Sequence, residues 1–258
     1  MPNHVTNILT LSGDENQINE LLERIKNDKF GIGTISFNKI IPMPESLNIE
    51  AGSCENNSIS IYLSAINPIN EDYPGVEKIK ADEFAELFNC IKKSVRFSPE
   101  ILLPLNEAKG KVLSNKGIED MMDMGRKYVN NLLEYSAATW YDWRIDNWGT
   151  KWDAYGYMDD FEYDGSGNLE FCTAWSAPHK VIEKLSEMFP DIEIEHKWAD
   201  EDIGYNCGRY TYENGELIGE YFPESEDDSI IFASEVMGLD PAEFGIDVQE
   251  DCMGMEEN

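Results

Sequence analysis

Aromatic and basic residues gather in the stretch between residues 140 and 155. Four of the six tryptophans lie there within 13 residues, and Trp175 follows downstream. Indole rings near polar groups can stack on sugars or bases or hold a cation, but they also fill the cores of sheets. The spacing favours core packing. A small-ligand site is the alternative, and its binding residues would be Trp143, Arg144, Trp148, Lys151, Trp152 and Trp175.

No residue pattern predicts a catalytic centre. The three histidines are scattered, and neither His179 nor His196 has a nucleophile partner that can be inferred from spacing. Pro2 offers one enzymatic alternative, because removal of Met1 would expose a secondary amine able to act as a base, as in tautomerases. The sequence therefore favours a protein without enzymatic activity.

Metal and cofactor sites are not predicted. The five cysteines are odd in number, widely spaced and without a C-x-x-C pair, as expected for reduced thiols rather than a disulfide or zinc framework. Asp160, Glu162, Asp164 and Gly165 match the start of a calcium loop, but the closing acid, Glu170, falls one position early. We therefore assign no metal and no cofactor.

The charge of the chain is strongly negative and uneven. The formal net charge is −31, and residues 151–258 hold 5 Lys/Arg against 29 Asp/Glu. Such a half repels phosphate backbones and anionic lipids, so direct nucleic-acid binding and membrane binding are disfavoured. It would attract a basic protein partner, or serve only to keep the protein soluble. No apolar run is long enough for a membrane span, and the start lacks the features of a secretory leader, so we expect a cytoplasmic protein.

The order of elements predicts an α+β fold. A strand at 5–12 precedes a helix that Asp14 caps, Ser58–Ile66 alternates like a strand, and helices are expected around 84–91 and 118–133. Strands, a helix and an Asn214-Gly215 hairpin follow. We predict an N-terminal α/β unit with added helices at 1–139, an antiparallel sheet domain with a C-terminal helix at 140–248, and an acidic tail at 249–258.

Three sequence strings resemble the YubB-like family of plasmid and phage proteins. They are Asn147-Trp-Gly-Thr-Lys-Trp-Asp-Ala154, Thr173-Ala-Trp-Ser-Ala-Pro178 and the opening Met1-Pro-Asn-His-Val-Thr-Asn7. The resemblance implies a ferredoxin-like α/β sandwich in the C-terminal half, without an iron–sulfur cluster, and carries no settled activity over to any residue.

Together these observations rank three hypotheses. The first is a non-enzymatic accessory protein of a mobile element that binds a basic protein through an acidic C-terminal surface, with nucleic-acid mimicry as one form of that binding. The second is a small-ligand module built on the tryptophan-rich segment. The third is an enzyme that uses the N-terminal proline.

Overall fold

The computed structural model describes residues 3–70, 72–73, 75–92 and 115–246. The chain divides into two compact units. One combines residues 1–42 with 147–258, and the other consists of residues 43–146. The first unit therefore joins both ends of the chain, so the division differs from the boundary expected between residues 139 and 140. Pro2 and the expected tail at 249–258 lie outside the described residues.

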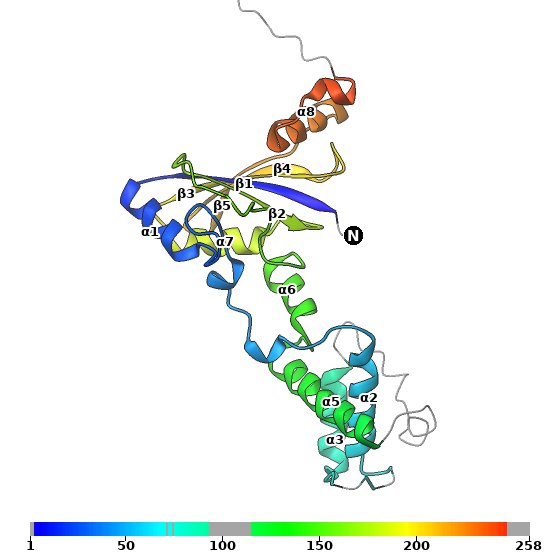
Figure 1. Ribbon diagram of the computed structural model, residues 1–258. Coiled ribbons are helices and arrows are strands. Elements are labelled where there is room, and N and C mark those ends of the chain that lie inside the picture. The colour runs from blue at the N-terminus through cyan, green and yellow to red at the C-terminus, as the bar shows by residue number, and fades with distance from the viewer. Residues whose placement is uncertain (1–2, 71, 74, 93–114, 247–258) are drawn as a thin grey trace, which may run out of the picture. The chain divides into compact units, whose positions relative to one another are not determined.

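The first unit is a five-stranded antiparallel sheet with helices on both faces (Figure 1). The spatial order is β2-β1-β3-β4-β5. The strands are β1 (His4–Ser12), β2 (Asn168–Ala174), β3 (Glu193–Asp200), β4 (Cys207–Glu213) and β5 (Glu216–Tyr221), and the helices are α1 (Glu15–Ile25), α7 (His179–Met188) and α8 (Glu226–Met237), with the 3₁₀ turns η1 (Phe37–Lys39) and η3 (Pro241–Phe244). This arrangement confirms the predicted α+β class.

Strand β1 is an interior strand of this sheet, second from the β2 edge. It pairs with β2 on one side and with β3 on the other, although β2 begins at Asn168 and β1 ends at Ser12. Because β2 and β3 both run antiparallel to β1, the connection through α7 links two parallel strands across the N-terminal strand. Alternate β1 residues are buried, as the period of a strand requires.

The two faces of the sheet receive different helices (Figure 1). On one face, Trp198 packs with Val5 and Ala177 near the start of α7. On the opposite face, the neighbouring residue Ala199 packs with Phe232 and other side chains of α8. Successive residues of a strand point to opposite faces, so the alternation along β3 sorts the side chains between the two helices.

A network of hydrogen-bonded polar side chains connects three neighbouring strands in the buried part of the sheet. His196 on β3 lies 3.0 Å from the Asn7 side-chain oxygen, and the Asn7 amide donates to Thr173 on β2 at 2.9 Å. Because the Asn7 oxygen can only accept, His196 must donate through Nε2. The Nδ1 atom of His196 is then a buried acceptor without a hydrogen-bond partner.

The second unit is helical throughout its described residues. Its elements are the 3₁₀ turn η2 (Glu45–Leu47), α2 (Ser53–Ile66), α3 (Ala81–Ile91), α5 (Asn115–Tyr135) and most of α6 (Trp140–Trp148). One cluster packs Ile59 and Leu63 of α2 against Tyr128 and Val129 of α5. A second packs Ile61 and Ala65 against α5 residues nearer its start.

The strand expected at Ser58–Ile66 is wrong, and the segment is part of α2. Its serine–isoleucine alternation resembles that of a half-buried strand. In the helix, however, both Ser60 and Ile61 are buried, because different sides of α2 face different clusters. A helix that is buried on several sides loses the 3.6-residue period that would identify it.

Gly125 sets the closest approach of α5 to α2. A Cβ atom at this position would overlap the carbonyl oxygen of Ser58, which is backbone and cannot rotate away. Gly125→Ala should therefore destabilise the second unit by about 1–3 kcal/mol, despite the better helix propensity of alanine. Urea unfolding would measure the change. Asn130→Ala, at an exposed position of the same helix, is the matched control, and equal midpoints for the two variants would contradict the prediction.

None of the described helices has the length and apolar character required to cross a bilayer.

Candidate functional site

Three of the six predicted binding residues come together. The Lys151 ammonium lies 4.9 Å from the ring centroid of Trp152 and 5.0 Å from that of Trp175. Lys151 and Trp152 precede β2 in sequence, and Trp175 directly follows it. Cation–π contacts of this kind hold the rings and the charge as one surface group.

The other three predicted residues have different surroundings. Trp148 is 1% exposed, its indole donates to the carbonyl of Ile41 at 2.9 Å, and its ring meets Phe37 edge-on. Trp143 is 7% exposed, and Arg144 lies over the ring of Trp140, with 5.1 Å between guanidinium carbon and ring centroid. The two buried indoles are therefore unavailable for stacking on a ligand, which is the core role that the spacing favours.

The motif around these residues ties distant segments of the first unit together. Thr150 donates to the carbonyl of Ala174 at 2.8 Å and accepts from its backbone nitrogen at 3.1 Å. Asp153 accepts from the Ser36 hydroxyl at 2.9 Å and from the Phe37 backbone at 2.6 Å. These hydrogen bonds give Thr150 and Asp153 of the 147–154 string structural roles, while Lys151 and Trp152 within it are half-buried.

Tyr155 closes the outer edge of β2. Its backbone exchanges two hydrogen bonds with Cys172, of 3.1 and 2.7 Å. Its hydroxyl donates to the carbonyl of Thr173 at 3.0 Å and lies 2.6 Å from His4 Nδ1, which must then act as the donor. Burial raises the pKa of Tyr155 to about 12, so this hydroxyl stays protonated and structural.

Trp175 has an unusual backbone conformation. Its φ angle is +72°, in the left-handed region that bulky side chains rarely adopt and that costs about 1–2 kcal/mol. Neighbouring contacts enforce it, since the Trp175 backbone nitrogen donates to the Asn3 carbonyl at 2.9 Å and Ser176 donates to the Gly149 carbonyl at 2.5 Å. The strained backbone presents an indole that is 42% exposed.

A pocket of about 610 Å³ opens beside this indole. Its lining comes from the start of β1, the end of β2 and the loop between β3 and β4, and consists of Asn3, Trp175, Asp200, Tyr205 and Asn206. Asp200 is 3% exposed, and its Oδ1 accepts from the Asn3 amide at 3.2 Å and from the Asp202 backbone at 3.0 Å. Tyr205 is 69% exposed. The lining of the pocket thus combines two aromatic rings, of Trp175 and Tyr205, with the buried carboxylate of Asp200.

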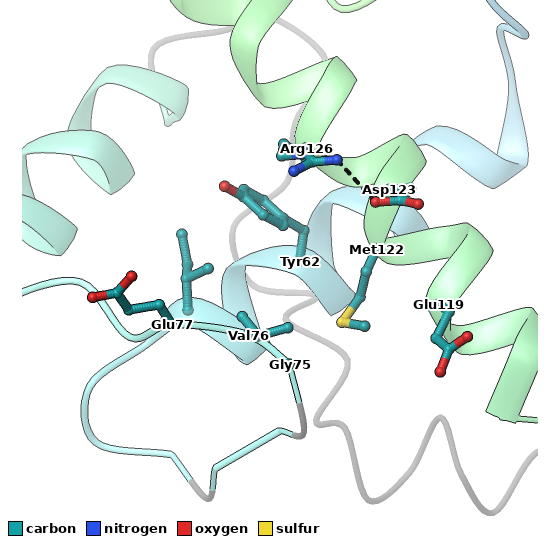
Figure 2. A pocket seen from close by; sticks show the side chains of 9 residues that line it. Tyr62, Gly75, Val76, Glu77, Glu119, Met122, Asp123 and Arg126 are labelled. Atoms are coloured by element: carbon teal, nitrogen blue, oxygen red, sulfur yellow. Dashed lines mark hydrogen bonds and ion pairs between the residues drawn. The ribbon is translucent and has the colours of Figure 1, made fainter.

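A second pocket, of about 480 Å³, lies within the helical unit between α2, α5 and the 75–77 loop (Figure 2). Figure 2 shows Tyr62 and Met122 on its walls, with Arg126 joined to Asp123. The Arg126 guanidinium donates to Asp123 at 3.0 Å. Burial raises the pKa of Tyr62, and the Arg126 charge partly opposes that rise. This pocket adjoins residue 74, outside the described part of the chain, and we assign it no ligand.

Two histidines that show no pairing signal in the sequence are neighbours in the structure. The rings of His179 on α7 and His196 on β3 lie 5.5 Å apart, and His179 also meets Trp198 at 4.5 Å and Tyr210 at 4.8 Å. Burial lowers the pKa of His179 to about 4. Burial, with the charge of His179 adding to it, lowers the pKa of His196 well below its usual value. No group of three metal-ligating side chains gathers in the described part of the chain.

Comparisons with known proteins found a family model and a solved structure that are similar to parts of this chain. Residues 151–242 match a family model described as the ferredoxin-like domain in Api92-like protein. A crystal structure of a protein called api92 from Yersinia pseudotuberculosis aligns over 87% of this chain and 99% of that one, with 12% identity and a TM-score of 0.39. None of the curated proteins matches the chain.

The family match at residues 151–242 confirms the ferredoxin-like domain expected in the C-terminal half. The YubB-like family itself stays a prediction. The match also begins at Lys151, so it leaves out β1, the interior strand that lies between β2 and β3 in this chain's sheet.

Sequence reasoning missed Asn3, Asp200, Tyr205 and Asn206 as parts of a site. They come from segments about 200 residues apart, and only the pairing of β1 with β3 brings them together. Nothing in the local sequence indicates that pairing. The one available signal was the Met1–Asn7 string, which belonged to the same resemblance as the Trp175 string.

Proposed function

We propose that this protein is a non-enzymatic accessory protein of a mobile genetic element that acts by binding a basic protein partner. The binding region is the β5–α8 surface, by which we mean residues 213–235. The motif resemblance supports the mobile-element setting. The chemistry of the β5–α8 surface supports the class of partner.

The observation that best supports this proposal is that the negative charge of residues 199–246 lies on a part of the chain that the structure describes. Of the 13 Asp and Glu in residues 199–246, 12 are exposed, and Asp200 is the buried one. Arg209 is the one Lys or Arg of that range, and its guanidinium already lies 3.5 Å from Glu195. A field from fixed carboxylates steers a positively charged protein toward this face.

Strand β5 adds an apolar component to the same surface. It is the outer strand of the sheet among the described residues, whereas the opposite outer strand, β2, is bridged by Tyr155. Leu217 and Ile218 are 46% and 53% exposed, and Phe222, just past the strand, is 48% exposed. Exposed apolar residues surrounded by charge are typical of protein-binding surfaces.

The charge also selects between possible occupants. An open edge strand invites pairing with a second copy of the same chain. Here Glu216 and Glu220 flank Ile218 on β5, so two such edges would bring like charges together. A basic partner would instead gain from the same carboxylates. If that partner normally holds nucleic acid, this protein would compete for it as a charge mimic.

A charge-neutral double variant tests the proposal. Glu216→Gln with Glu220→Gln should slow association with the partner and weaken its salt dependence, because rim charges act chiefly on the association rate. The measurement is capture from host lysate at low salt, identification of the bound protein, and association kinetics with the purified partner.

Glu20→Gln with Glu162→Gln is the matched control, because it removes two exposed charges elsewhere in the same unit. The proposal fails if the captured protein is acidic or neutral, or if the control weakens binding as much as the β5 variant. Competition by duplex DNA for the same partner would support mimicry.

A further inference from the structure

We infer that the pocket beside Trp175 receives an arginine side chain of the basic partner. The inference rests on the proposed function for the identity of the partner, but the pocket's preference for a guanidinium group can be tested without it. Three observations carry it: the strained indole, the buried carboxylate, and the position of the pocket beside the acidic helix α8.

The pocket offers oxygen atoms that can accept further hydrogen bonds. The hydrogen bonds to Asp200 from the described residues reach Oδ1, which leaves Oδ2 open to a donor from a ligand. Because the Asn3 amide nitrogen donates to Asp200, the side-chain oxygen of Asn3 is a second acceptor. A carboxylate with an oxygen open to further donors suits a ligand with several N–H groups, and guanidinium has five.

The aromatic walls favour a flat cation. Trp175 is held at a φ angle of +72° by backbone contacts and keeps its indole 42% exposed. Its ring already meets one cation, the Lys151 ammonium at 5.0 Å, so a partner's guanidinium would join that contact. Guanidinium stacks on indole faces and pairs with carboxylates, whereas an ammonium lacks the planar shape for both at once. Tyr205, 69% exposed, provides the second ring.

The position of the pocket links it to the β5–α8 surface. A Cβ atom on Gly204, next to Tyr205, would lie 3.1 Å from the side chain of Ile230 on α8. The loop that carries Tyr205 therefore packs on α8, whose first turn contains Glu226, Asp227 and Asp228. Glu201 and Asp202, both exposed, continue the negative charge to the pocket mouth. An arginine from a partner seated on α8 would meet this pocket next.

The first experiment is a calorimetric titration of the full chain with N-acetyl-L-arginine methylamide. The citrulline analogue has nearly the same shape without the charge and is the matched ligand, and the lysine analogue and maltose complete the set. We expect arginine to bind at least about tenfold more tightly than citrulline and lysine, and maltose not to bind. Equal affinity for arginine and citrulline, or binding of maltose alone, would overturn the inference.

Two variants separate binding from folding. Asp200→Asn should weaken arginine binding about tenfold or more. Trp175→Gly should weaken it too, yet leave the melting temperature unchanged or higher, because glycine adopts the positive φ angle without strain. A Trp175→Gly protein that melts lower and still binds arginine would identify the indole as a structural residue.

The two proposals fail in distinguishable ways. If arginine analogues do not bind but the Glu216/Glu220 variant still loses the partner, the pocket inference falls and the proposed function stands. If arginine binds and depends on Asp200 while no basic protein is captured, the pocket stands as a guanidinium site and the proposed partner falls.

Discussion

A chain that lacks residues 1–14 is expected to lose the entire ferredoxin-like sheet. Strand β1 is paired along its length with both β2 and β3, and Val5 and Leu9 are fully buried. Without it, β2 and β3 would be separated by a strand-wide gap of about 10 Å, with unpaired backbone on both sides. Far-UV circular dichroism and amide exchange should show loss of the sheet.

The same reasoning predicts that residues 140–248 do not fold when expressed alone, although they contain the whole segment that matches the ferredoxin-like model. Adding a synthetic peptide of residues 1–14 should restore the sheet by supplying the missing strand. A cooperative unfolding transition of residues 140–248 without that peptide would contradict the prediction.

A complementary deletion provides the control. The Trp148 indole donates to the carbonyl of Ile41 at 2.9 Å, so the chain leaves the first unit and returns to it at neighbouring points. Residues 1–42 joined to 147–246 by a short Gly/Ser linker should therefore keep the sheet. The two deletions test different things, because one removes the interior strand β1 and the other removes a separate compact unit.

Stability is expected to fall steeply as the pH drops from 7 to 5, because of the buried histidine pair. In the unfolded chain a histidine titrates near pH 6.5. In the folded chain His179 stays neutral until the pH nears 4, and burial holds the pKa of His196 well below its usual value as well. Between these values the unfolded state binds protons that the folded state does not, so protonation favours unfolding.

The size of the effect follows from the same difference. At pH 5, His179 removes about 2 kcal/mol of the unfolding free energy present above pH 6.5, since a pKa unit corresponds to about 1.4 kcal/mol. His196 acts in the same direction, and even the His179 part is sizeable beside the 5–15 kcal/mol typical of a folded domain. Urea unfolding at pH 7 and pH 5 measures it.

His179→Phe should roughly halve this pH dependence. A phenyl ring can keep the contacts with Trp198 and Tyr210, and the Nδ1 atom it removes has no hydrogen-bond partner. Val181→Ala, at a fully buried position of the same helix, should lower stability equally at both pH values. If Val181→Ala flattened the pH dependence as much as His179→Phe, the histidines would not be its source.

The sequence by itself determined the local elements of this protein. The Asp14 cap and the Asn214-Gly215 turn depend on residues that are neighbours in the chain, and both are found as expected. The charge asymmetry is likewise a property of composition. Local preferences and net charge can be read from neighbours in the chain, because that is where their causes lie.

Only the tertiary structure decided which segments share a sheet, a core or a pocket. It placed β1 between β2 and β3, made Ser58–Ile66 a helix buried on several sides, and separated Trp148 from Trp175. It also brought His179 to His196 and Asn3 to Asp200. These outcomes come from burial and hydrogen bonding between residues far apart in the chain, and the pattern around any one of them does not contain its partner.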